Sequence, residues 1–253
     1  MGNGEREHVR VAIISDIHGN LVALEAVLAD LDAERVDQIV CLGDVATFGP
    51  RPREVITRLG ALNCPVVMGN MDAWLLNPRP HEVRDEDSQR ITEIEFWSAH
   101  QLLPADLDYL RTFRPTVEIT LGGDATLLCF HGSPQSNTDV IVSTTSEEEL
   151  ERLLSGFSAT VMAGGHTHVQ ILRRHRDLVF INPGSVGLPF ERARYADQVR
   201  NPPWAEYGLV SWEDGGLNIE LRRVPFDVGM VIRAARDSGM PHLEWWVKNW
   251  SRG

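Results

Sequence analysis

Five short segments of the sequence combine glycine with side chains that can bind metal ions or carry protons. They are Asp16-Ile17-His18, Gly43-Asp44, Gly69-Asn70-Met71-Asp72, His131-Gly132 and Gly165-His166-Thr167-His168. Asp16 and His18 are two residues apart, so in an extended chain both side chains point the same way, and the same holds for His166 and His168. The neighbouring glycines allow sharp turns and a close approach of the backbone to a compact centre.

Together these segments provide two carboxylates, one amide oxygen and four imidazoles. The side chains are those of Asp16, His18, Asp44, Asn70, His131, His166 and His168. A mixed nitrogen and oxygen set favours Mn, Fe, Zn or Co over Ca or an all-oxygen Mg site. Seven ligands are too many for one ion and suit two ions about 3.5–4 Å apart that share a carboxylate, the arrangement used for in-line displacement at phosphorus. Two divalent ions would outweigh the two carboxylates and leave positive charge for a hydroxide and a phosphate oxygen.

These segments lie at or just beyond the ends of short apolar runs, where open α/β sheets place their sites. Strands are predicted at residues 9–15, 38–42, 65–68, 116–121, 126–130, 160–163, 169–173, 178–181, 207–212 and 217–222. Helices are predicted at 21–31, 53–62, 88–103, 105–113, 146–154 and 227–250, the first of them capped by Asn20. The alternation of strands and helices predicts a layered α/β architecture.

The chain is predicted to form one domain. Residues 1–8 are polar and are predicted to be a disordered tail, and no linker rich in Pro, Gly or Ser divides residues 9–253. Residues 77–115 are rich in Pro and charge and are predicted to be a small helical insertion that caps the surface.

Taken in order, the five segments resemble the motifs of the calcineurin-like metallophosphoesterase superfamily. Residues 14–20, 43–50 and 182–187 are similar to its small bacterial and archaeal branch, and the resemblance extends from about residue 9 to about residue 224. It implies a four-layer αββα sandwich of two mixed β-sheets flanked by helices, with a site for two metal ions at one edge. The loop at 182–187 is expected to border that site, with Asn182 fixing it.

The resemblance also implies a role for each ligand. Asp16, His18 and His168 would bind one metal ion. Asn70, His131 and His166 would bind the other, and Asp44 would bridge the two. The expected nucleophile is a hydroxide held between two divalent transition-metal ions, with Mn the first expectation and Fe, Zn, Co or Ni as alternatives.

Residue 71 departs from the family pattern. Much of the superfamily has a histidine there, taken as proton donor to the leaving group or as a transition-state contact, with the carboxylate at position 72 as its partner. Here Met71 cannot donate a proton, whereas Asp72 remains and, with Asn70, is predicted to be catalytic. General acid catalysis contributes roughly 10²–10⁴-fold. Relatives without the histidine are associated with phosphodiesters, so a phosphodiesterase is predicted rather than a monoesterase.

Composition limits the possible partners. With 24 Lys and Arg against 36 Asp and Glu, the formal charge is −12, which opposes non-specific nucleic-acid binding. A small phosphate ester is the predicted substrate. Cys41, Cys64 and Cys129 are predicted to be reduced core residues of a cytoplasmic protein. No run reaches the roughly 18 apolar residues of a membrane span.

Several alternatives stay open. A protein phosphatase would have fuller versions of the Gly43 and Gly69 motifs, and a catalytically silent binding scaffold would be expected to have lost ligands. Leu243, Trp246, Val247 and Trp250 form an apolar stripe that suits core packing or a homodimer through the C-terminal helix. The remaining histidines are predicted to be solvated: His8, His81, His100, His175 and His242. His81 and His100 lie in the insertion, from which either could replace the missing proton donor.

Overall fold

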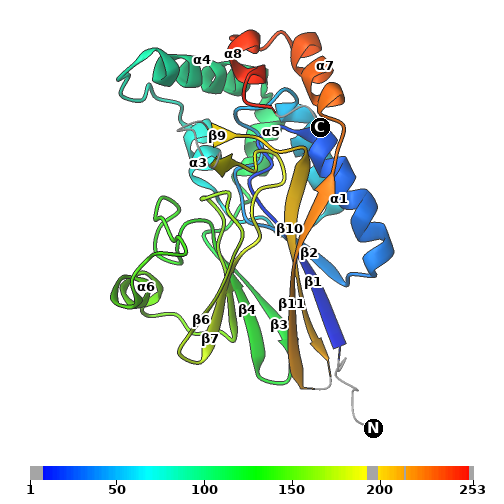
Figure 1. Ribbon diagram of the computed structural model, residues 1–253, viewed down its shortest axis with the longest axis vertical. Coiled ribbons are helices and arrows are strands. Elements are labelled where there is room, and N and C mark those ends of the chain that lie inside the picture. Colours follow the sequence, from blue (N-terminus) through cyan, green and yellow to red (C-terminus); the bar gives the residue numbers. More distant parts are fainter. Residues whose placement is uncertain (1–7, 193–198, 214, 251–253) are drawn as a thin grey trace.

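A computed structural model describes residues 8–192, 199–213 and 215–250, and shows two β-sheets with helices on their outer faces (Figure 1). The first sheet has the order β11-β10-β1-β2. Its strands are β1 (His8–Ile14), β2 (Gln38–Cys41), β10 (Trp204–Glu213) and β11 (Gly216–Pro225). β1 runs parallel to β2 and antiparallel to β10, so the sheet is mixed.

The second sheet has the order β3-β4-β5-β7-β6. Its strands are β3 (Val117–Gly122), β4 (Ala125–Cys129), β5 (Val161–Ala163), β6 (Ile171–His175) and β7 (Leu178–Asn182). β4, β5 and β7 are parallel, and the outer strands β3 and β6 are antiparallel to their neighbours. A short pair, β8 (Glu191–Arg192) and β9 (Val199–Arg200), was not predicted.

The four layers follow from the alternation of side chains along the strands. In β1, Val11 and Ile13 face the second sheet, whereas Ala12 and Ile14 pack against α1 (Leu21–Glu34). α1 begins as predicted at Asn20, whose Oδ1 accepts the Ala23 N–H at 3.1 Å. On the far side, α6 (Glu147–Leu154) covers the second sheet. The predicted αββα sandwich of two mixed sheets is confirmed.

The other helices lie toward one end of the sheets. They are α2 (Pro52–Leu62), α3 (Asn70–Leu76), α4 (Glu86–Gln101), α5 (Pro104–Leu110), α7 (Val228–Ser238) and α8 (Leu243–Val247). Figure 1 shows α4, α7 and α8 together at this end. The predicted insertion thus supplies α4, which packs on α7 and α8, and α5, which packs on α2 and α3.

The C-terminal stripe is part of the core. Trp246 and Trp250 are buried with α4 and α7, and the rings of these two tryptophans lie 5.2 Å apart. Trp245 lies off the stripe, where its Nε1 donates to Asp87 at 2.9 Å and its ring meets the edge of Phe48. The stripe is therefore packed within one chain, as expected for core packing, and a homodimer through this helix stays a prediction.

Other local predictions differ from the structure. Residues 65–68 form single bridges, Cys41 with Val66 and Val67 with Arg114, rather than a strand. The predicted C-terminal helix is two helices, because the chain turns at Gly239 with φ of 71°. Residues 1–7 of the predicted tail lie outside the described residues. No helix in the described part of the chain is long and apolar enough to cross a membrane.

Candidate metal centre

The seven predicted ligand residues meet where strands of both sheets end. Asp16 and His18 follow β1, Asp44 follows β2 and Asn70 opens α3, while His131 follows β4 and His166 and His168 follow β5. Their side chains form two groups, Asp16/His18/His168 and Asp44/His131/His166, with the ligand atoms of each group within 4.8 Å of one another. Residues as far apart in sequence as Asp16 and His168 are therefore brought to one point.

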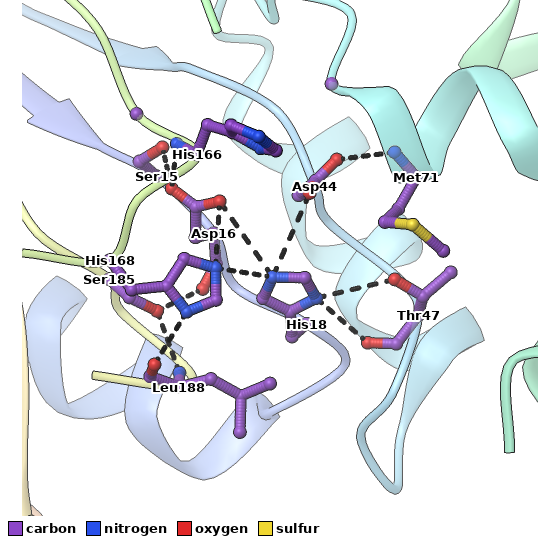
Figure 2. A network of polar contacts seen from close by, with 12 residues as sticks. Ser15, Asp16, His18, Asp44, Thr47, Met71, His166, His168, Ser185 and Leu188 are labelled. Carbon is purple, nitrogen blue, oxygen red and sulfur yellow. Dashed lines mark hydrogen bonds and ion pairs between the residues drawn. The ribbon is translucent and has the colours of Figure 1, made fainter. Parts of the chain in front are cut away.

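In the first group the imidazole nitrogens face a carboxylate oxygen (Figure 2). Nε2 of His168 lies 3.3 Å from Asp16 Oδ1, and Nε2 of His18 lies 3.9 Å from the same atom. The two Nε2 atoms are 3.0 Å apart. All three side chains are largely enclosed, and that of Asp16 is fully buried.

While both imidazole rings are neutral, this arrangement has no hydrogen-bond donor among its three ligand atoms. Nδ1 of His168 lies 2.8 Å from the Leu188 carbonyl oxygen, and Nδ1 of His18 lies 3.3 Å from that of Thr47. Because a carbonyl oxygen only accepts hydrogen bonds, each Nδ1 carries the proton, and each neutral ring presents a lone pair at Nε2. Asp16 Oδ1 is buried without a hydrogen-bond partner. Three electron-rich atoms therefore face one another, as they would around a cation.

The second group repeats the pattern. Nε2 of His131 lies 3.4 Å from Asp44 Oδ2 and 2.9 Å from Asn70 Oδ1, and its Nδ1 faces the Leu42 carbonyl oxygen at 2.8 Å. The His166 ring lies 5.1 Å from that of His131. The structure thus places Asn70 beside the second group, as the resemblance implies.

Asp44 lies between the two groups. Its Oδ2 is 3.4 Å from His131 Nε2 and 4.0 Å from His18 Nε2, so the same oxygen faces a histidine of each group. Its Oδ1 accepts the backbone N–H of Met71 at 2.8 Å (Figure 2). This position suits a carboxylate shared by two ions.

The electrostatics of the pocket favour positive charge. Burial would raise the pKa of Asp16 and of Asp44, but the imidazoles of His168 and His131 hold both below their ordinary values. Against the effect of burial, Asp44 raises the pKa of His131 to about 10, and Asp16 raises that of His168. The buried carboxylates therefore attract either protons or metal ions.

The pKa values of the two remaining histidines are lowered rather than raised. Burial and the neighbouring His168 lower the pKa of His18 to about 4, and burial and His131 lower that of His166. Both rings are therefore neutral at pH 7, which is the form that binds metals.

The backbone of the loops is unusual at the ligands themselves. Five non-glycine ligand residues have φ between 47° and 67°, in the left-handed region: Asp16, His18, Asp44, His166 and His168. Two glycines make the approach of the loops possible. A Cβ at Gly43 would lie 2.5 Å from the Gly69 nitrogen, and one at Gly69 would lie 2.2 Å from Asp44 Oδ1. Any side chain there would push the loops apart.

Asp72 has a different place from the one predicted. Its carboxylate is fully buried and accepts backbone N–H groups of Asp44 at 2.7 Å, Val45 at 2.9 Å and Gly69 at 3.1 Å. Burial and the Asp44 carboxylate raise its pKa to about 7. With both oxygens engaged by the backbone, Asp72 holds two ligand loops together and does not face the metal centre. These contacts support a positioning role for Asp72, and its part in catalysis stays a prediction.

The loop at 182–187 borders the centre as expected. Asn182 Nδ2 donates to the Gly165 carbonyl oxygen at 2.7 Å and lies 3.0 Å from Thr167 Oγ1, which fixes the segment that carries His166 and His168. Ser185 is buried and its hydroxyl donates to the Asp16 carbonyl oxygen at 2.7 Å. Both residues therefore hold ligand loops in place.

Among the other histidines, the solvated prediction is wrong for His175. It is 4% exposed, with Nδ1 2.5 Å from Glu147 and Nε2 3.0 Å from Glu151, both on α6. His100 is exposed, and His242 pairs with Glu93. His81 lies 3.3 Å from Glu95, a buried carboxylate that sequence analysis did not single out.

A hollow of about 660 Å³ adjoins the centre on the side of His166 and His168. Apart from Ser143, Thr144 and Thr167, its other walls are apolar: Val140, Val142, Val169, Ile171 and Phe190. Val140 and Val169 are two of the few large apolar side chains that are exposed in the described chain. The hollow has no acidic or basic side chain apart from the two histidines, so it suits an uncharged, apolar group.

Comparison with known proteins agrees with this geometry. The sequence-family model for the calcineurin-like phosphoesterase superfamily domain matches residues 9–198 of this chain. A metallophosphoesterase from Sphaerobacter thermophilus has 30% sequence identity and a TM-score of 0.70, with 95% of this chain and 97% of that chain covered.

Two further proteins are similar over almost the whole chain. A hypothetical protein from Pyrococcus horikoshii has the same fold, with 19% identity, a TM-score of 0.76 and coverage of 95% and 96%. An uncharacterized protein of Methanocaldococcus jannaschii is 26% identical over 256 residues, which is 93% of this chain and 94% of that protein.

Proposed function

This chain belongs to the calcineurin-like phosphoesterase superfamily, and from its metal centre we propose that it hydrolyses phosphate esters with two divalent metal ions. We propose further that it prefers phosphodiesters to monoesters. One observation carries the proposal. Asp16 Oδ1, which is buried without a hydrogen-bond partner, and the Nε2 atoms of His18 and His168 lie within 4.8 Å of one another, and the ligand atoms of Asp44, His131 and His166 form a second group of this size beside them.

Each residue of the centre has a defined task. Asp16, His18 and His168 would hold one ion, His131, His166 and Asn70 the other, and Asp44 both. Bound there, two divalent ions would supply a water of lowered pKa and positive charge for the phosphoryl oxygens. The carbonyl groups behind the Nδ1 atoms fix the ring tautomers. Mn is the first expectation because the ligands mix nitrogen with oxygen.

Two features support a diester substrate. Met71, at the position of the family histidine, offers a thioether that cannot protonate a leaving group, which disfavours substrates that need such help. A diester also carries a second organic group, and the apolar hollow beside His166 and His168 has room for one.

The overall charge of −12 favours a small ester over a nucleic acid held by its backbone. The three cysteines are unpaired, consistent with the cytoplasmic location that we propose.

The test compares bis(4-nitrophenyl) phosphate with 4-nitrophenyl phosphate in the presence and absence of Mn²⁺. We expect Mn²⁺-dependent hydrolysis, faster for the diester, and its loss in Asp44→Asn, which keeps the size of the side chain. Asp177→Asn, on an exposed turn, is the matched control. Silence toward both esters with Mn²⁺ shown to be bound would overturn the proposal and favour the binding scaffold.

A further inference from the structure

A buried carboxylate in the helical insertion has no hydrogen bond for one of its oxygens. Glu95, on α4, is 7% exposed, and its Oε2 is buried without a hydrogen-bond partner. Nε2 of His81 lies 3.3 Å from this oxygen, within ion-pair distance when the ring is protonated. Leaving such an oxygen unpaired is unfavourable for folding, so its presence points to a role beyond stability.

The helix that carries Glu95 rests on a ligand loop. Ser98 lies one turn further along the same face of α4, and its hydroxyl oxygen accepts the Phe48 N–H at 3.3 Å. Phe48 directly follows Thr47, whose carbonyl oxygen faces His18. Glu95 therefore points toward the segment that begins at Asp44. Consistent with this position, burial and the Asp44 charge raise the pKa of Glu95 to about 7.

His81 lies on the opposite side of this carboxylate, against α3. Its ring stacks on Trp74, with centroids 5.7 Å apart and an angle of 17°. Trp74 is held in turn, because its Nε1 donates to the Arg79 carbonyl oxygen at 2.8 Å and its ring meets the edge of Phe96. The imidazole is thus placed between a fixed aromatic face and a buried carboxylate.

The position of Trp74 relates His81 to the gap left at residue 71. Met71 and Trp74 are three residues apart on α3, so they share one face of the helix. The side chain of His81 is 48% exposed. Among the described residues its Nδ1 has no hydrogen-bond partner, since only Nε2 faces Glu95. The ring is thus held on a tryptophan one helical turn from Met71, with Nδ1 left to donate a proton.

We propose that His81 donates the proton to the leaving-group oxygen and that Glu95 is the positioning residue that orients its ring. The inference rests on the proposed phosphodiester hydrolysis. As the oxygen of the attacking water bonds to phosphorus, the bond between phosphorus and the leaving oxygen breaks. The electron pair of the broken bond passes to the leaving oxygen, which takes the proton from Nδ1 of the imidazolium. Glu95 accepts the Nε2–H and stabilises the charged ring, and water returns the proton after each turnover.

The experiment exploits the leaving group. Methyl 4-nitrophenyl phosphate releases 4-nitrophenolate, a stable anion that leaves with little help from a proton donor. Methyl phenyl phosphate releases phenolate, which is more basic and depends more on a proton donor. With the Mn²⁺-loaded enzyme, we expect His81→Gln to lower kcat/KM for the phenyl ester about 10²-fold more than for the nitrophenyl ester. Glu95→Gln should show the same selectivity with a smaller loss. His100→Gln, exposed on the same helix, is the matched control.

Two readouts separate proton donation from a structural role. Added imidazole should restore hydrolysis of the phenyl ester by His81→Gly, and it should do so more than for the nitrophenyl ester. Equal losses on both esters, or no loss on either, would overturn the role of His81 while leaving the proposed function intact. Absence of Mn²⁺-dependent hydrolysis of either ester by the unmodified protein would instead overturn the proposed function, and this inference with it.

Discussion

Nε2 of His18 lies 3.0 Å from Nε2 of His168, although each ring already directs its Nδ1 at a backbone carbonyl oxygen. If both rings were neutral, two lone pairs would face each other and repel, so a proton or a metal ion at these nitrogens favours the contact. Asp16 Oδ1 completes the same small volume. The structure therefore holds these ligand atoms in positions that a bound proton or metal ion stabilises, and this has consequences for the stability of the fold.

Binding of Mn²⁺ is expected to stabilise the fold, because the ions bind the folded state and relieve the repulsion between ligands. At a metal concentration about 100 times Kd, one site adds about 2.7 kcal/mol. For a chain of this size the thermal midpoint should rise by about 5 °C or more. Scanning calorimetry with Mn²⁺ or EDTA measures this. Asp16→Asn should lose most of the Mn²⁺-dependent rise in the thermal midpoint, and Asp177→Asn should keep all of it. Identical midpoints with and without Mn²⁺ in the unmodified protein would contradict the expectation.

Asp72→Ala is expected to destabilise the protein and weaken metal binding together. The substitution leaves the N–H groups of Asp44, Val45 and Gly69 without their acceptor inside the protein. Each buried unpaired group costs about 1–3 kcal/mol, so the free energy of unfolding should fall by about 3 kcal/mol or more. Urea unfolding tests this, with Asp108→Ala on the surface as control. A loss of activity at unchanged stability would instead favour a catalytic Asp72.

Met71→His is expected to raise turnover of phosphate monoesters. The new imidazole would stand where the family carries its proton donor, and general acid help is worth roughly 10²-fold at the lower end. The ratio of diester to monoester kcat/KM should therefore fall. Met71→Leu, which keeps an apolar side chain, is the control. An unchanged ratio in the histidine variant would show that residue 71 does not set the substrate class.

Glu95→Gln is expected to make stability less dependent on pH. The pKa of Glu95 is raised from 4.5 to about 7 in the folded chain, by burial and by Asp44. The unfolded chain loses this proton at lower pH, so the free energy of unfolding falls as pH rises from about 4.5 to 7, by on the order of 3 kcal/mol.

The glutamine variant has no such proton to lose. The free energy of unfolding of the variant minus that of the unmodified protein should therefore be larger at pH 8 than at pH 4. Urea unfolding in EDTA at both pH values measures this difference. His81 from the insertion and Asp44 from the ligand loop are the titratable groups that bear on Glu95. Glu118→Gln, on the exposed side of β3, is the control. A constant difference between variant and unmodified protein across this range would show that Glu95 ionises at an ordinary pH.

Much of the architecture could be predicted because it depends on residues that are close together in the sequence. The apolar spacing in α1 and the cap at Asn20 define a helix without reference to other segments. The ligand residues stand beside glycines after apolar runs. The apolar run predicts a strand, and the glycine predicts the turn that follows it. α3 was missed because it has only seven residues. Its first turn is set by the carboxylate of Asp72 at the N–H of Gly69, and no apolar stripe marks it.

Features that depend on distant packing could not be predicted. His175 lies between two arginines in sequence and looks solvated, yet α6 covers it with Glu147 and Glu151. Glu95 looks like part of a solvated helix face, since nothing in its own segment shows that a ligand loop and His81 enclose it. Asp72 matches a family motif in type, but only the three-dimensional contacts show that its oxygens are used by the backbone.

Both ligand groups take a histidine from Gly165-His166-Thr167-His168 and an aspartate from the first fifth of the chain. During synthesis, the amino-terminal ligands would leave the ribosome long before their histidine partners exist, and a small domain folds as a unit once enough of it has been made. Neither site can therefore form on the nascent chain before its histidine, at position 166 or 168, has been synthesised. Strands β10 and β11, which complete the first sheet, are synthesised later still, so all the ligand residues exist before the strands of the fold are complete.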